Sequence, residues 1–154
     1  MSERYPTNLY RHTSQLIEYF FETEFGAQYY VRFRQAQYQF KIDCKPCRSI
    51  FEVSFNPESA SQFPDYRVKN TILHLIREFM EEQRAPILYI CDNLDGRESE
   101  RQRLFYRWFA KLQIAELQHD YRIVKLEDYT LILGIIAFKW DTHFNHYFEQ
   151  IEHI

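Results

Sequence analysis

Glycine is scarce in this chain, which has only three glycines among its 154 residues, at positions 26, 96 and 134. Loops that wrap a nucleotide phosphate need closely spaced glycines, because bare backbone amides must approach the phosphate oxygens. The spacing here excludes both the phosphate-binding loop of nucleotide hydrolases and the dinucleotide-binding fingerprint. The sequence also has no Gly-x-Ser-x-Gly nucleophile motif and no His-Glu-x-x-His zinc motif.

Long apolar runs are also missing. The longest apolar run, Leu131–Phe138, is far too short to span a bilayer, and the first residues lack a signal-peptide pattern. The three cysteines fit a reducing compartment better than a disulfide framework. The net charge of −3 gives no overall attraction to nucleic acid or anionic lipid. We therefore expect a cytoplasmic protein that does not bind membranes.

Aromatic side chains are abundant, with 14 Phe and 12 Tyr in a chain that is 45% hydrophobic. This composition is typical of an ordered globular protein. A chain of this length buries roughly 70% of its unfolded surface as one unit. The prediction is one α+β domain over residues 1–154, in which residues 1–16 are the part least expected to be ordered.

The first third of the chain alternates apolar and polar residues, which is typical of an antiparallel meander. We predict strands at Ile17–Glu24 and Gln28–Arg34, joined by a hairpin turn at residues 25–27. Two more strands are predicted at Gln37–Asp43 and Ser49–Phe55. The aromatic strand at 17–24 is a candidate sheet edge that could pair with another chain.

The remaining residues alternate between helical and strand patterns. Apolar residues recur at helical spacing over 65–82, and residues 86–91 read as a central strand covered on both faces. A turn and a second helix follow, then strands at 121–127 and 130–139 and a short helix near 142–151. This order predicts a mixed, mostly antiparallel sheet of about seven strands with helices packed on it, in which strand 86–91 is parallel to a neighbour.

This order of elements resembles the core of the N-acetyltransferase superfamily. In that family a glycine-containing loop before the first core helix wraps the pyrophosphate of acetyl-CoA, and a tyrosine on the later helix protonates the departing thiolate. The corresponding loop here, residues 59–67, has no glycine. Tyr106 matches the tyrosine, but helical projection places it away from the apolar stripe. The resemblance implies the fold. If the protein is a divergent acyltransferase, the resemblance also implies acetyl-CoA as cofactor and Tyr106 or Asp92 as catalytic residue.

The stretch from Ile90 to Phe109 reads ICDNLDGRESERQRLFYRWF. It is similar to a pattern in small, uncharacterised bacterial proteins that form a family of unknown function. That resemblance implies no activity.

The same stretch contains the strongest candidate for a ligand site. Its acidic residues fail the spacing of an EF-hand at both ends, whereas Asp95 and Ser99 have the spacing of helix caps. Arg97 and Arg101 are predicted to overhang the carboxyl end of strand 86–91, where they would clamp a small anion. The competing interpretation pairs both arginines with Asp92 and Asp95, and we favour that internal pairing.

Cys44 and Cys47 form a second motif, Cys-Lys-Pro-Cys. Redox-active pairs normally stand at a helix N-terminus, whereas a strand is predicted to follow here. Zinc is the alternative, with His143 and His146 as the other two ligands. A plain turn is the favoured interpretation, and no metal is expected.

The leading functional hypothesis is a non-catalytic binding or regulatory module on an acetyltransferase-like scaffold. The first alternative is a divergent N-acyltransferase that uses acetyl-CoA. The second is a nucleic-acid-binding module that uses Arg103, Arg107 and Lys111 on the exposed face of the second helix. Candidate partners are a small anionic ligand, a partner protein or a second copy of the chain.

Overall fold

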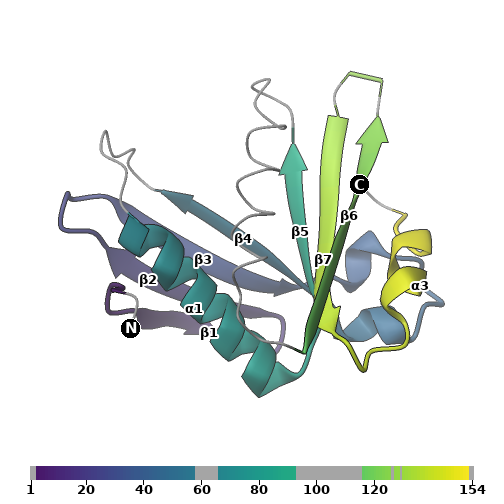
Figure 1. Cartoon of the computed structure of the whole chain (residues 1–154), viewed down its shortest axis with the longest axis horizontal. Coiled ribbons are helices and arrows are strands. Elements are labelled where there is room, and N and C mark those ends of the chain that lie inside the picture. Colours follow the sequence, from purple (N-terminus) through teal and green to yellow (C-terminus); the bar gives the residue numbers. More distant parts are fainter. Residues whose placement is uncertain (1–2, 58–65, 93–115, 126, 129, 153–154) are drawn as a thin grey trace.

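The computed structural model describes residues 3–57, 66–92, 116–125, 127–128 and 130–152 (Figure 1). Within these ranges seven strands form one sheet in the order β1-β2-β3-β4-β5-β7-β6. The elements are β1 (Asn8–His12), β2 (Leu16–Glu22), β3 (Gln28–Gln35), η1 (Gln37–Gln39), η2 (Pro46–Ser49), β4 (Phe51–Pro57), α1 (Tyr66–Gln83), β5 (Ile87–Asp92), β6 (Leu117–Lys125), β7 (Thr130–Phe138) and α3 (Phe144–Glu149). Neighbouring strands are antiparallel except β4 and β5. The predicted α+β class with a mixed, mostly antiparallel sheet is confirmed.

The hairpin of β2 and β3 forms where the sequence predicts it. Gly26 has a φ of +83°, a backbone conformation that residues with a Cβ rarely adopt. The turn is closed by Thr23, whose N–H donates to the Ala27 carbonyl (2.8 Å) and whose hydroxyl accepts from the Ala27 N–H (3.0 Å). The glycine and the threonine therefore fix the register of the two aromatic strands.

The predicted strand at 37–43 is wrong. This segment contains the 3₁₀ helix η1 and one isolated bridge, between Phe40 and Ile151. β3 pairs directly with β4, so among the described elements no strand runs beside the inserted segment between them. The three alternate apolar residues do not share a buried face as they would in a strand, because Phe40 is buried whereas Tyr38 and Ile42 are exposed.

β1 occupies a stretch for which the sequence predicted no element. All five of its residues are exposed, so no alternation marks it as a strand. It pairs with β2, which is therefore an interior strand rather than the edge of the sheet. The segment before it is fixed to α1, since the Tyr5 N–H donates to the Thr71 hydroxyl at 2.8 Å.

Helix α1 lies across one face of the sheet and forms the larger core (Figure 1). Its buried residues are Thr71, Ile72, Leu75, Ile76, Phe79 and Met80. The ring of Phe79 stacks on Phe33 of β3 with centroids 4.2 Å apart, and burying a ring of this size contributes about 2 kcal/mol. Across the described part of the chain, no helix is both long enough and apolar enough to cross a membrane.

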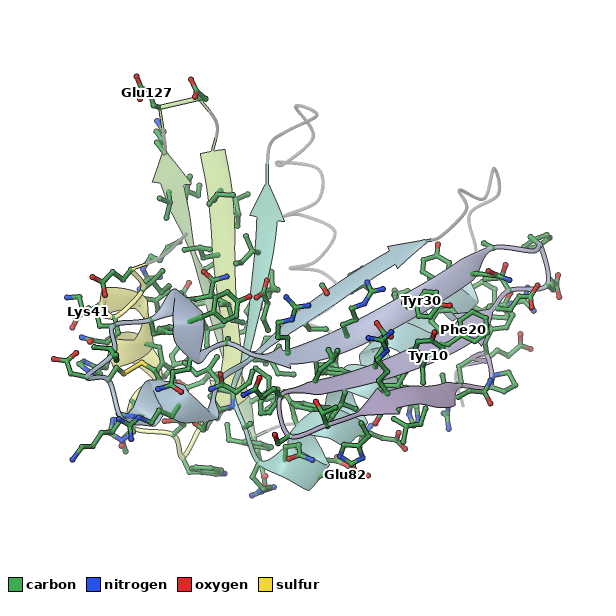
Figure 2. All side chains as sticks on the ribbon, turned by 180° about the vertical axis from the view of Figure 1, so that it is seen from behind. Tyr10, Phe20, Tyr30, Lys41, Glu82 and Glu127 are labelled. Atoms are coloured by element: carbon green, nitrogen blue, oxygen red, sulfur yellow. A yellow bond between two sulfur atoms is a disulfide. The ribbon has the colours of Figure 1, made fainter. Side chains whose placement is uncertain are left out.

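A second core covers the opposite face, but only over β5 and β7. There η1, η2 and α3 enclose Leu88, Ile135 and Ala137, with Phe144 and Tyr147 from the helix. β5 and β7 are thus covered on both faces. No described element covers β2 to β4 on the face opposite α1, which Figure 2 shows from behind.

Gly134 on β7 lies where only glycine fits. Tyr89 of β5 is its cross-strand neighbour, and a Cβ at position 134 would overlap the atoms of the Tyr89 ring. The ring crosses β7 at this point, and its hydroxyl reaches Nε2 of His119 on β6 at 2.6 Å. The missing side chain at 134 therefore permits a contact between two strands that are not adjacent.

Replacing Gly134 with alanine should destabilise the protein by about 1–3 kcal/mol, because the buried Tyr89 ring must move. Urea unfolding of Gly134→Ala would measure the loss. The same substitution in a Tyr89→Leu background should cost much less, since the obstructing ring is gone. An equal cost in both backgrounds would contradict the packing described here.

Candidate functional site

β4 and β5 separate soon after they meet. Their parallel ladder consists of Phe51 with Ile87 and Glu52 with Leu88, and the Phe51 N–H donates to the Pro86 carbonyl at 3.1 Å. Figure 1 shows the two strands diverging beyond this point. Polar backbone groups alternate sides along a strand, so those of Ile90 point toward β4 as those of Leu88 do. Openings at the carboxyl ends of parallel strands are where open sheets bind ligands.

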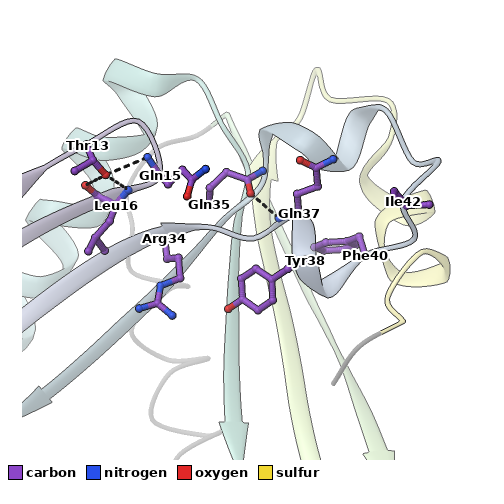
Figure 3. Close-up of a pocket in the computed structure, with 9 residues that line it drawn as sticks. All are labelled: Thr13, Gln15, Leu16, Arg34, Gln35, Gln37, Tyr38, Phe40 and Ile42. Carbon is purple, nitrogen blue, oxygen red and sulfur yellow. Dashed lines mark hydrogen bonds between the residues drawn. The ribbon is translucent and has the colours of Figure 1, made fainter.

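A pocket of about 750 Å³ lies on the uncovered face of the sheet (Figure 3). The turn between β1 and β2, the end of β3 and the segment around η1 form its walls. Arg34 is its one charged lining residue among the residues that the structure describes. The lining consists of Thr13, Gln15, Leu16, Arg34, Gln35, Gln37, Tyr38, Phe40 and Ile42.

Two of the polar lining residues hold the walls in place. The Thr13 hydroxyl accepts hydrogen bonds from two backbone N–H groups of the turn that follows it, at 3.3 and 3.0 Å. The side chain of Gln35 donates to the Arg48 carbonyl (2.8 Å) and accepts from the Gln37 N–H (3.0 Å). Thr13 and Gln35 therefore shape the pocket, and their polar groups are already engaged.

Arg34 differs from these residues. Its side chain is exposed, and among the described residues no hydrogen bond or ion pair involves its guanidinium. Glu52 lies directly opposite it on β4, but the Glu52 carboxylate accepts a 2.6 Å hydrogen bond from the Tyr38 hydroxyl instead. Figure 3 shows the side chains of Arg34 and Tyr38 on the same side of the sheet. The pocket thus presents one positive charge.

Tyr38 remains a hydrogen-bond donor at neutral pH. Burial and, after it, the hydrogen bond to Glu52 raise the pKa of the Tyr38 phenol. The nearby charge of Arg34 acts in the opposite direction. Tyr38 therefore keeps Glu52 engaged and separate from Arg34.

Two other described arginines on this face, Arg11 and Arg32, have partners. Glu18 is only 4% exposed, and it forms ion pairs with Arg32 and with Arg11, the latter at 3.9 Å. The Arg32 guanidinium also lies over the Tyr30 ring, 5.4 Å from its centroid. Tyr30 belongs to an aromatic group on the same face, labelled in Figure 2. These arginines therefore stabilise the sheet, and Arg34 is the one that faces the pocket.

His119 and Asp120 lie within β6. Burial lowers the pKa of His119 from its usual value to about 4, although the Asp120 carboxylate acts in the opposite direction. The imidazole is consequently neutral at neutral pH. It lies against the Tyr89 hydroxyl and serves as a structural contact between β5 and β6.

Most of the site residues predicted from the sequence lie outside the described part of the structure. Asp92 closes β5, but only its backbone is described. The others are Asp95, Arg97, Arg101 and Tyr106, together with Arg103, Arg107 and Lys111 of the predicted basic face. The anion clamp, the acyltransfer residue and the nucleic-acid face remain predictions.

Cys44 and Cys47 form a disulfide, with Cα atoms 5.3 Å apart. This differs from the expectation of reduced cysteines. The helical turn η2 begins within the motif, at Pro46, and the predicted strand follows it as β4. Both cysteines are buried in the second core. His143 and His146 are exposed on the neighbouring segment. Within the described ranges, no group of three or more His, Cys, Asp or Glu residues gathers as metal ligands would.

Protonation of His119 should lower stability in acid. The folded-state pKa of about 4 lies below the ordinary value of 6.5, so the unfolded chain binds more protons between these values. The stability contribution is therefore complete above pH 6.5 and is lost as pH falls toward 4, by about 2 kcal/mol after allowance for partial exposure.

Urea unfolding of wild-type and His119→Gln protein at several pH values would measure this effect. The stability difference between the two proteins should shrink as the pH falls from 6.5 to 4. A difference that stays constant over that interval would show that His119 is not held neutral by burial.

These features define an α+β protein whose mixed sheet leaves a pocket accessible on one face. The model of a family of unknown function, DUF6169, matches residues 64–153, more than half of the chain. The chain therefore belongs to this family, which confirms the resemblance drawn from the Ile90–Phe109 stretch. No curated protein and no solved structure matches the chain. The pocket is built from residues that precede the matched region.

Proposed function

We propose that the protein is a non-catalytic binding module on an acetyltransferase-like scaffold, and that it holds a small anionic ligand at Arg34. The observation that carries this proposal is the pocket itself. Its one charged lining residue is an arginine for which the described residues provide no partner. A guanidinium in such a pocket gains charge-assisted hydrogen bonds when an anion enters, worth about 1.5–3 kcal/mol each.

The order of the strands supports the acetyltransferase-like scaffold. One parallel pair, β4 with β5, follows an antiparallel meander, and α1 connects the two strands. The sequence supports binding rather than acyl transfer, because residues 59–67 contain no glycine to wrap a pyrophosphate. The protein would therefore have the scaffold of an acetyltransferase without acyl transfer from acetyl-CoA.

A divergent acyltransferase is the second candidate, and one observation favours it. The ladder between β4 and β5 ends after two pairs, and the opening beyond it is suited to an extended ligand that carries amide groups. Acetyl-CoA is such a ligand. A binding module that uses the Arg34 pocket and an enzyme that uses the opening therefore differ in where their ligands lie.

Isothermal titration calorimetry with citrate, inorganic phosphate and acetyl-CoA distinguishes the two candidates. We expect citrate or phosphate to bind and Arg34→Gln to weaken that binding at least about tenfold, since the substitution removes the charge of the anchor. Arg48→Gln is the matched control, because Arg48 is exposed and does not line the pocket.

Two results would contradict the binding-module proposal. One is the absence of any anion binding that depends on Arg34. The other is micromolar binding of acetyl-CoA that survives Arg34→Gln, which would place the ligand in the opening and support the acyltransferase.

A further inference from the structure

We infer that the ligand of the Arg34 pocket is an N-acylated α-carboxylate, the chemistry shared by an N-acyl amino acid and the carboxyl end of a peptide. This inference rests on the proposed function and adds the chemical class of the ligand. Three properties of the lining lead to it: its single charge, its amide side chains and its apolar surface.

The single charge selects a monoanion. Arg34 is the only cation in the described lining, and the Glu52 carboxylate stands directly opposite it on β4. A dianion or trianion can bind at Arg34 but keeps charge without compensation, and Glu52 weakens its binding, so a monoanion should bind more tightly. A carboxylate carries one charge, and its two oxygens match the parallel N–H groups of a guanidinium.

The amide side chains select a ligand that also contains an amide. Gln15 and Gln37 line the pocket, and no hydrogen bond of their side chains is found among the described residues. Each primary amide offers both a donor and an acceptor, which are the two groups that a secondary amide needs. Gln35 is excluded from this role because both ends of its side chain are already bonded.

The apolar surface selects an uncharged hydrocarbon side chain on the ligand. Ile42 is 84% exposed and Tyr38 is 50% exposed, whereas Phe40 is buried. Leu16 lies on the other side of Arg34 in Figure 3. A leucine-like group on the ligand would remove these exposed surfaces from water at about 25 cal/mol per Å². Carboxylate, amide and apolar group together describe an acylated apolar amino acid.

N-acetyl-leucine and N-acetyl-leucinamide form the decisive pair of probes, because they differ only in the carboxylate. ¹H–¹⁵N NMR titration should show shifts at Leu16, Arg34, Gln37 and Phe40, with at least tenfold tighter binding of the acid. Arg34→Gln should abolish that preference, and Arg48→Gln should leave it unchanged. Gln37→Glu, which adds a negative charge to the pocket, should also abolish it.

A third probe, the peptide acetyl-Ala-Ala-Leu, identifies the source of the ligand. Tighter binding than N-acetyl-leucine indicates a peptide end, and weaker binding indicates a small acylated amino acid. Both outcomes support the inference, because both probes carry an N-acylated α-carboxylate.

The failure of the inference differs from the failure of the proposed function. If citrate or phosphate binds through Arg34 while N-acetyl-leucine does not bind, or binds no more tightly than its amide, the ligand class is wrong and the anion site stands. If no anion binds, both fail. Unchanged spectra of Arg34→Gln and Gln37→Glu away from the pocket verify that these variants remain folded.

Discussion

The short parallel ladder of two residue pairs between β4 and β5 is the contact on which the rest of the architecture depends. It joins the antiparallel half formed by β1 to β4 to the half formed by β5, β7 and β6. Helix α1, which connects these two strands, packs against residues of both halves and so holds them in one core. Because the pairing ends after Leu88, the halves diverge. Within the described structure, only β5 and β7 of the second half are covered on both faces.

Because of this unequal packing, the face of β2 to β4 opposite α1 is left uncovered by the described elements, and its side chains are the ones that a ligand can contact. Buried Glu18 forms ion pairs with Arg11 and Arg32, and the Tyr38 hydroxyl donates to the Glu52 carboxylate. These contacts engage the charged side chains that neighbour Arg34 on this face. Arg34 lies at the point where β3 ends and the inserted segment around η1 begins. The proposed ligand site is therefore a consequence of where the insertion folds.

Local sequence patterns predicted those elements in which buried residues recur at the regular spacing of a strand or a helix. The strands β2 and β3, the hairpin at Gly26 and helix α1 are such cases, and the parallel pair followed from the crossover. The pocket could not be predicted in this way. The alternation at Tyr38, Phe40 and Ile42 has the period of a strand, although the described structure gives this segment only one isolated bridge. Nothing local marks Arg34 as different from Arg32. The contact of Tyr89 with His119 across Gly134 depends on β7 lying between β5 and β6, which no local pattern indicates.

Amide hydrogen exchange at Ile90 tests most directly whether the halves of the sheet are separated beyond the second pair. The Ile90 N–H points toward β4, whereas that of neighbouring Tyr89 points toward β7 and belongs to a continuous antiparallel ladder. We predict that Ile90 exchanges at least about a hundredfold faster than Tyr89 in the ligand-free protein. Equal protection of the two amides would contradict the account, because it would show that the opening between β4 and β5 is closed.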